Sequence, residues 1–174
     1  MTSYIFDAEW VVEEGDDIVL DAKRLHCVIF KELDKECYHR FSGDTLYTMY
    51  QWLKSNVNAT YIGHNILNAD LEVFRRLLGI PFRVGADSIV GTPCTFIDTY
   101  TMSKRNNPDR LPAYYKGKSQ GVHGLKPWGI RTGLQKPEVD DWSSQPLEVY
   151  LHRCEADVVN NEATYNMLLD ENGC

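Results

Sequence analysis

The chain has 174 residues, 43% of them hydrophobic, and this size suits one compact domain with a full apolar core. The N-terminal sequence has no basic stretch, long apolar run or small-residue cleavage site, so it predicts neither a signal peptide nor a membrane span. We therefore expect a cytoplasmic protein with no membrane partner. The five cysteines are widely spaced and form no C-x-x-C pair, which argues against a disulfide framework and a zinc knuckle.

The net charge of −7 disfavours a nucleic-acid partner at first sight, because backbone binding depends on Lys and Arg neutralising phosphates. The charge is unevenly distributed, however, since residues 103–131 contain seven basic residues and one acid. Tyr114, Tyr115 and Trp128 in the same segment offer ring faces on which bases can stack. Composition leaves two interpretations open, a nucleic-acid-binding segment or a solvated loop.

The first part of the chain predicts three strands joined as an antiparallel meander. Apolar runs at 4–9, 25–31 and 36–41 are separated by polar turn sequences, so their pairing needs no long crossover. A helix is predicted over 45–56, with Asp44 as its capping candidate. Its apolar residues recur at helical spacing, so we expect it to pack on the sheet: Leu46, Met49, Tyr50 and Leu53.

The second part alternates strands and helices. A strand at 59–63, a helix at 69–78 ended by Gly79 and a fifth strand at 94–97 predict a parallel crossover. Residues 103–124 are interpreted as a long basic loop inserted before the C-terminal helices, and such loops are usually functional or mobile. The last helix is predicted to begin between Pro146 and Cys154 and to end near Leu169. The order predicts a single α/β domain over residues 1–174.

Four acids are candidates for one metal site. Asp7 and Glu9 are two residues apart on a strand, so their side chains point to the same face. Asp70 opens a helix and Asp157 lies in the last helix. Carboxylates without cysteine or paired histidine partners favour Mg²⁺ or Mn²⁺, the ions of phosphoryl chemistry. Each acid alone also has a structural interpretation, as an exposed strand end for Asp7 and Glu9 or as a helix-dipole partner for Asp70.

His152 precedes Asp157 by five residues. Five helical residues turn about 140° past a full revolution, so these two side chains would not share a face if both lay in mid-helix. We therefore expect His152 in the loop or first turn that leads into the last helix. A lone histidine is also common as a polar surface residue.

Together these stretches resemble the DnaQ-like (DEDD) 3′→5′ exonucleases, and more closely the proofreading exonuclease domain of phage-type family A DNA polymerases. The resemblance covers essentially the whole chain and rests on three motifs in order: Phe6-Asp7-Ala8-Glu9, His64-Asn65 followed by Asp70, and His152 with Ala156-Asp157-Val158. Two further stretches are similar to the family: Ile97-Asp98-Thr99, and the linker residues 124–129 with Gly133 and Lys136.

The chain departs from the family pattern at two positions. Ala69 replaces the aromatic residue that usually precedes the second-motif aspartate, and Arg153 replaces the tyrosine that stands four residues before the last aspartate. Arginine is not deprotonated in proteins and cannot act as a base. His152 instead fits the histidine subtype of the family (DEDDh).

The resemblance implies a ribonuclease H-like fold with a mixed five-stranded sheet flanked by helices. It implies that Asp7, Glu9 and Asp157 hold one divalent ion. Asp7 would also touch a second ion ~3.5–4 Å away, which Asp70 reaches through water. His152 would accept the proton of the attacking water, with His123 as a weaker rival. The implied substrate contacts are Trp10, Asn65, Lys104, Arg105, Lys116, Lys118 and Arg153. Asp98 is expected to brace the strand-to-helix turn.

The implied function is metal-dependent removal of nucleoside 5′-monophosphates from the 3′ end of single-stranded DNA, in proofreading or DNA processing during phage replication. The protein would be free-standing or a DNA polymerase subunit, in the host-cell cytoplasm if phage-encoded. An alternative of the same fold acts on RNA or oligonucleotides, since nothing marks a 2′-hydroxyl reader. A second alternative is a catalytically silent polymerase-docking module, against which the presence of four acids and a histidine argues.

Overall fold

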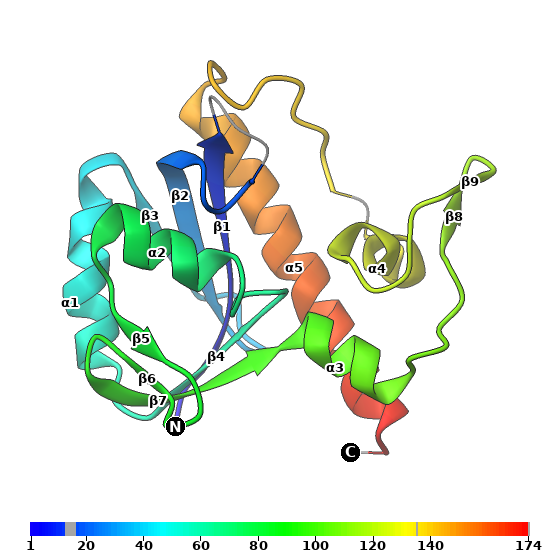
Figure 1. Ribbon diagram of the computed structural model, residues 1–174, viewed down its shortest axis with the longest axis horizontal. Coiled ribbons are helices and arrows are strands. Elements are labelled where there is room, and N and C mark those ends of the chain that lie inside the picture. Colours follow the sequence, from blue (N-terminus) through cyan, green and yellow to red (C-terminus); the bar gives the residue numbers. More distant parts are fainter. Residues whose placement is uncertain (13–16, 135, 174) are drawn as a thin grey trace.

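The computed structural model describes residues 1–12, 17–134 and 136–173. Within these ranges a seven-stranded mixed sheet has the strand order β3-β2-β1-β4-β7-β6-β5 and carries helices on both faces, as Figure 1 shows. A separate two-stranded hairpin, β8-β9, lies beside α4 at the edge of the molecule (Figure 1). The predicted α/β class is confirmed.

The predicted N-terminal meander is also confirmed. β1 (Ser3–Val12) pairs antiparallel with β2 (Ala22–Glu32), and β2 pairs antiparallel with β3 (Tyr38–Ser42). The helix predicted over 45–56 is divided into a 3₁₀ helix, η1 (Gly43–Tyr47), and α1 (Thr48–Ser55). The cap is Ser42 rather than Asp44, because the Ser42 amide donates to the Thr45 hydroxyl at 2.8 Å and so closes the first turn earlier.

The parallel crossover lies at the centre of the sheet. β4 (Ala59–Gly63) is parallel to both β1 and β7 (Thr92–Asp98), and α2 (Asp70–Leu78) follows β4 and ends at Gly79 in the left-handed conformation. The predicted strand number of five was too low. β5 (Phe82–Arg83) and β6 (Ser88–Ile89) extend the sheet, and two-residue strands are too short to show an alternating apolar pattern.

The sequence predicted one continuous loop over residues 103–124, and this prediction was wrong. α3 (Thr99–Asn106) occupies the first part, and the hairpin of β8 (Tyr114–Tyr115) and β9 (Lys118–Ser119) occupies the second. α3 is mostly polar, so it lacks the apolar stripe by which a helix is identified from sequence. α4 (Leu125–Thr132) follows the hairpin, and the predicted last helix is α5 (Leu147–Glu171).

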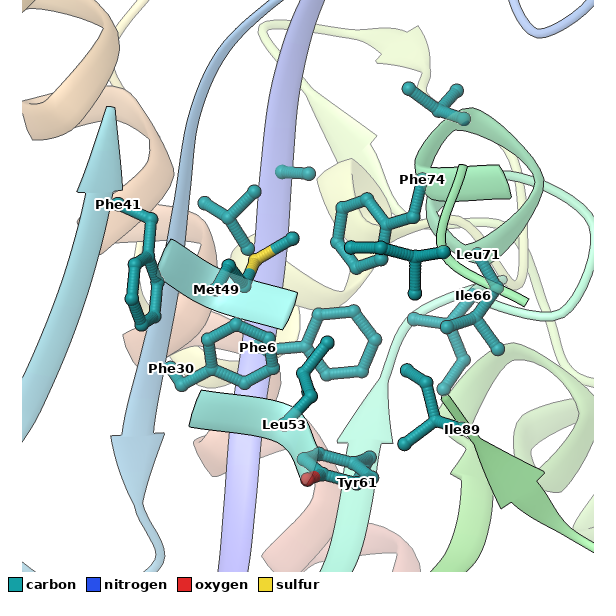
Figure 2. Packing of buried hydrophobic residues seen from close by; sticks show 14 of the residues in the cluster. Phe6, Phe30, Phe41, Met49, Leu53, Tyr61, Ile66, Leu71, Phe74 and Ile89 are labelled. Atoms are coloured by element: carbon teal, nitrogen blue, oxygen red, sulfur yellow. The ribbon is translucent and has the colours of Figure 1, made fainter. Parts of the chain in front are cut away.

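Alternating side chains of β1 face two separate cores. Tyr4, Phe6 and Ala8 pack with residues of α1 and α2, and Figure 2 shows Phe6 and Phe30 against this helical layer. Ile5 faces the opposite side, where it packs with Tyr150, Cys154 and Val158 of α5. Because side chains alternate along a strand, Asp7 and Glu9 share the α5 side with Ile5. The register of β1 therefore directs both acids toward the last helix.

No helix within the described ranges is both long and apolar enough to cross a membrane. The four cysteines that the structure describes are free thiols: Cys27, Cys37, Cys94 and Cys154. The fold is thus maintained by its two apolar cores, in agreement with the absence of cysteine pairing motifs in the sequence.

Candidate active site

Three of the four predicted metal-binding acids converge between β1 and α5. The Cys154 thiol donates to the Asp7 carbonyl at 3.2 Å, which fixes α5 against β1 one helical turn before Asp157. Carboxylate oxygens of Asp7, Glu9 and Asp157 lie within 4.8 Å of one another. The β1–β2 register shifts directly after Glu9, between Glu9 and Trp10, and such bulges re-aim side chains next to functional sites.

Asp70 lines the same cleft from the start of α2. It is the first residue of α2 and is only 3% exposed. The chain reaches it through a tight loop after Gly63, where an added Cβ would lie 2.1 Å from Ile66 Cγ2. Glycine at this position therefore permits the loop to fold back against the sheet and deliver Asp70 to the cleft.

Asp98 braces this loop, as expected from the sequence. Its buried carboxylate accepts hydrogen bonds from the backbone amides of Asn65 at 3.1 Å and Leu67 at 3.3 Å. It also caps α3 by accepting from the Thr101 amide at 3.1 Å. One carboxylate thus fixes the ends of two neighbouring parallel strands, and it is not among the residues that line the cleft.

The acidic cluster has the properties of a divalent-cation site. Glu9 Oε1, Asp70 Oδ1 and Asp157 Oδ1 are buried and have no hydrogen-bond partner within the described part of the chain. Burial, and then repulsion from Glu9, raises the pKa of Asp7 well above its ordinary value. Burial likewise raises the pKa of Glu9 to about 8 and that of Asp70 to about 7. A cation between these oxygens removes both the desolvation penalty and the repulsion.

Two basic side chains reach the same carboxylates. Lys136 Nζ lies 3.1 Å from Asp157 Oδ2, and Arg153 Nε lies 3.1 Å from the same oxygen and 3.6 Å from Glu9 Oε1. Arg153 also donates through Nη1 to the Pro137 carbonyl, which ties the segment before α5 to the helix. Four carboxylates therefore face two cations, and an excess of negative charge remains for metal ions.

The cleft has a volume of about 490 Å³ and is lined by acidic, basic and aromatic side chains. Trp10 and Trp142 line it from β1 and from the segment before α5, and Leu125 contributes apolar surface. Trp142 is fixed by stacking on Tyr150, with ring centroids 5.9 Å apart, and the Arg153 guanidinium lies 5.8 Å from its ring. The combination of carboxylates, cations and indole rings suits a phosphate-linked nucleoside.

The predicted position of His152 was wrong. α5 begins at Leu147, so His152 lies in its second turn and not in a preceding loop. It is exposed and lines a different hollow, with Glu155 and Val159, while Asp157 faces the acidic cleft. Because the two residues are five positions apart on the helix, their side chains point about 140° apart, and His152 faces away from the carboxylates.

Of the residues predicted to contact the substrate, some line the acidic cleft and others do not. Trp10, Asn65 and Arg153 line the acidic cleft. Four predicted phosphate contacts do not line it: Lys104 and Arg105 in the last turn of α3, and Lys116 and Lys118 in the β8–β9 hairpin. His123, the rival base, also lies outside the cleft, with Nδ1 2.9 Å from Ser103 Oγ.

Three further cleft residues were given no role from the sequence. Lys136 and Trp142 lie in the irregular segment before α5, where no periodicity marks a functional side chain. His64 lines the cleft after β4, and burial lowers its pKa to about 3, so its imidazole is neutral. The sequence had marked His64 and Lys136 as parts of family-like motifs without giving either a role, and it carried no such signal for Trp142.

The chain matches no protein-family model and no curated protein. Several solved structures share its fold. The family B DNA polymerase of the hyperthermophilic archaeon Pyrobaculum calidifontis matches 97% of this chain with a TM-score of 0.63 and 17% identity, over 24% of the polymerase. The E. coli exonuclease I–ssDNA complex in its zinc-bound form matches 99% with a TM-score of 0.59 and 13% identity, over 41% of the enzyme.

Exonuclease I from Methylocaldum szegediense matches 98% of the chain with a TM-score of 0.58 and 13% identity, over 41% of that enzyme. The chain thus spans less than half the length of each of these proteins. At such identities the similarity establishes the fold and not the activity. The chain has the ribonuclease H-like α/β fold that exonuclease I and a family B DNA polymerase also contain.

Proposed function

We propose that the protein is a divalent-metal-dependent 3′→5′ exonuclease that removes nucleoside 5′-monophosphates from single-stranded DNA, in phage replication or its proofreading. The observation that carries this proposal is the convergence of Asp7, Glu9 and Asp157, with Asp70 in the same cleft, and three buried oxygens without hydrogen-bond partners. A docking module has no use for such a cluster, because buried carboxylates that lack a cation destabilise the fold.

The four carboxylates are the proposed ligands of two Mg²⁺ or Mn²⁺ ions. When bound, such ions would stabilise the charge that develops on the phosphoryl and leaving oxygens and would lower the pKa of water for attack. Oxygen ligands of this kind suit hard cations, and the described residues that line the cleft include no cysteine and one histidine, His64, which disfavours a zinc-selective site. Either ion fits the donor set.

The chain's own residues position the substrate. Lys136 and Arg153 place positive charge on the wall beside Asp157, where a phosphate oxygen can exchange for their present carboxylate partners. Trp10 and Trp142 offer ring faces to the terminal nucleoside, and stacking of this kind is worth about 1–3 kcal/mol per base. Stacking is tolerant of base identity, as an exonuclease requires.

Single-stranded DNA is the proposed substrate because the described lining of the cleft combines charged groups with two indole rings, on which bases stack irrespective of their identity. E. coli exonuclease I, of the same fold, has been solved with single-stranded DNA and with a dT13 oligonucleotide. His152 is not assigned as the general base in this proposal, because it does not face the carboxylates.

The proposal is tested by a time course on 5′-labelled single-stranded DNA, with a matched RNA strand, in Mg²⁺, Mn²⁺ and EDTA. We expect a ladder that shortens from the 3′ end with either metal and stops in EDTA, with nucleoside 5′-monophosphate as the product. Faster shortening of the RNA would reassign the substrate. Intact strands with every metal, from protein shown to be folded, would contradict the proposal and favour a silent docking module for a polymerase.

A further inference from the structure

A second cavity adjoins the acidic cleft. It has a volume of about 170 Å³, and its lining residues come from β8, from α4, from α5 and from the segment that precedes α5. Lys136 and Arg153 line both hollows, so they stand at the junction between them. Because both side chains contact Asp157, the junction lies directly beside the acidic cluster. Figure 1 shows α4 and the β8–β9 hairpin side by side on this part of the molecule.

The cavity differs from the cleft in charge. Lys126 joins Lys136 and Arg153 in its lining, against one acid, Glu138, so the wall carries net positive charge. Lys126 Nζ lies 3.7 Å from Glu138 Oε1, and these side chains are 54% and 84% exposed. An exposed ion pair of this length contributes little, so Lys126 can exchange Glu138 for a phosphate oxygen at small cost.

Tyr115 completes the cavity from the hairpin. Its ring is partly exposed, and Lys116 Nζ lies 5.3 Å from the ring centroid. An exposed tyrosine ring bordered by basic side chains is a suitable surface for a nucleic-acid base, which stacks irrespective of its identity. The cavity is smaller than the ~300–1,000 Å³ pockets that enclose a whole drug-sized ligand. It therefore suits one part of a longer chain molecule whose remainder lies elsewhere.

We propose that this cavity is the subsite for the nucleotide on the 5′ side of the scissile phosphate, with Lys126 on its phosphate and Tyr115 against its base. This inference rests on the proposed exonuclease function. A terminal nucleotide in the larger aromatic cleft places its phosphate at the acidic cluster, next to Lys136 and Arg153. In this proposal the rest of the strand leaves past these two residues, which line the basic cavity as well as the cleft.

The test compares two substrates that differ at this subsite. A short oligo-dT strand has a nucleotide on the 5′ side of the scissile phosphate, whereas the p-nitrophenyl ester of thymidine 5′-monophosphate has p-nitrophenol in its place. We expect Lys126→Ala to lower kcat/KM on the oligonucleotide by about tenfold or more relative to the ester, mainly through KM, since a hydrogen bond to a charged group contributes about 1.5–3 kcal/mol. The salt dependence of oligonucleotide binding by this variant should correspond to the release of about one counterion fewer than in the wild type.

Tyr115→Ala should lower the ratio of kcat/KM on the oligonucleotide to kcat/KM on the ester by about 5- to 150-fold, the equivalent of one stacked base. Lys54→Ala removes the same charge from the end of α1, on the opposite face of the sheet, and should leave the ratio unchanged. If the wild type hydrolyses both substrates and neither variant changes their ratio, the subsite is wrong and the proposed function stands. If the folded wild type hydrolyses neither substrate, the proposed function fails and the subsite fails with it.

Discussion

Replacement of Glu9 by glutamine should stabilise the metal-free protein and at the same time weaken its proposed metal site. Burial raises the pKa of Glu9 from its ordinary range to about 8, with repulsion from Asp157 adding to the effect and Arg153 opposing it. A group whose pKa is raised by folding stabilises the native state while it is protonated. That contribution is complete below the unfolded pKa of about 4.3 and is lost as the pH rises through about 8. Metal-free wild type should therefore lose stability between pH 5 and pH 8.

The magnitude follows from the pKa. One pKa unit corresponds to about 1.4 kcal/mol, so the full shift corresponds to several kcal/mol in the absence of coupling. The carboxylates of the cluster titrate together, and Arg153 loses an attractive partner in the variant, so we expect Glu9→Gln to stabilise the metal-free protein by about 1–3 kcal/mol at pH 8. For a chain of this length each kcal/mol raises Tm by about 2–4 °C.

Urea denaturation at pH 5.5 and pH 8, in EDTA and in Mg²⁺, measures this effect. In EDTA the variant should be more stable than wild type at pH 8, and its advantage at pH 5.5 should be about a third as large. Mg²⁺ should remove most or all of this advantage, because an ion at 100 times its Kd stabilises the wild type by about 2.7 kcal/mol and the variant has lost a ligand. Glu148→Gln, at an exposed position in the first turn of α5, is the matched control; it should lower stability by no more than about 0.3–1 kcal/mol, equally at both pH values and with or without Mg²⁺. A Glu9→Gln variant that is less stable than wild type in EDTA at pH 8 would refute the reasoning.

Asp7→Asn should reduce exonuclease turnover at least about a hundredfold while the circular dichroism spectrum stays that of wild type, because Asp7 contributes to both proposed ion sites; turnover within tenfold of wild type would contradict the metal assignment. His152→Ala should retain turnover within about threefold, since its side chain faces away from the cleft, and a hundredfold loss at constant binding would restore it as the general base. Asp98→Ala should lower the free energy of unfolding by about 2–4 kcal/mol in chemical denaturation, because three backbone amides lose a charged acceptor; a loss below about 0.5 kcal/mol would show that water replaces it.

Much of the fold was predictable because its central elements carry strong periodic patterns. The strand at 59–63 agrees with β4 at both ends, and the predicted meander agrees with β1, β2 and β3 in order and direction. The misses have local causes. β5 and β6 are too short for alternation, α3 is too polar for an apolar stripe, and the 3₁₀ turn of η1 shortens the first helix.

The sequence predicted those parts of the candidate site in which the spacing of residues determines the direction of their side chains. Alternation on β1 placed Asp7 and Glu9 together, and the structure brings Asp157 to them. His152 could not be placed because its direction depends on where α5 begins, and the sequence left that start open over several residues. Lys136 was noted only as part of a family-like linker and Trp142 was not noted, because tertiary packing alone determines how an irregular segment approaches a cleft.

The most direct test of the metal site is crystallography of the protein with Mn²⁺, using anomalous scattering to locate the ions. We predict two peaks about 4 Å apart in the acidic cleft. One should lie among Asp7, Glu9 and Asp157, and the second between Asp7 and Asp70, with Lys136 and Arg153 displaced from Asp157. Density for Mn²⁺ elsewhere, or a cleft that keeps both ion pairs and binds no metal at millimolar Mn²⁺, would contradict the account.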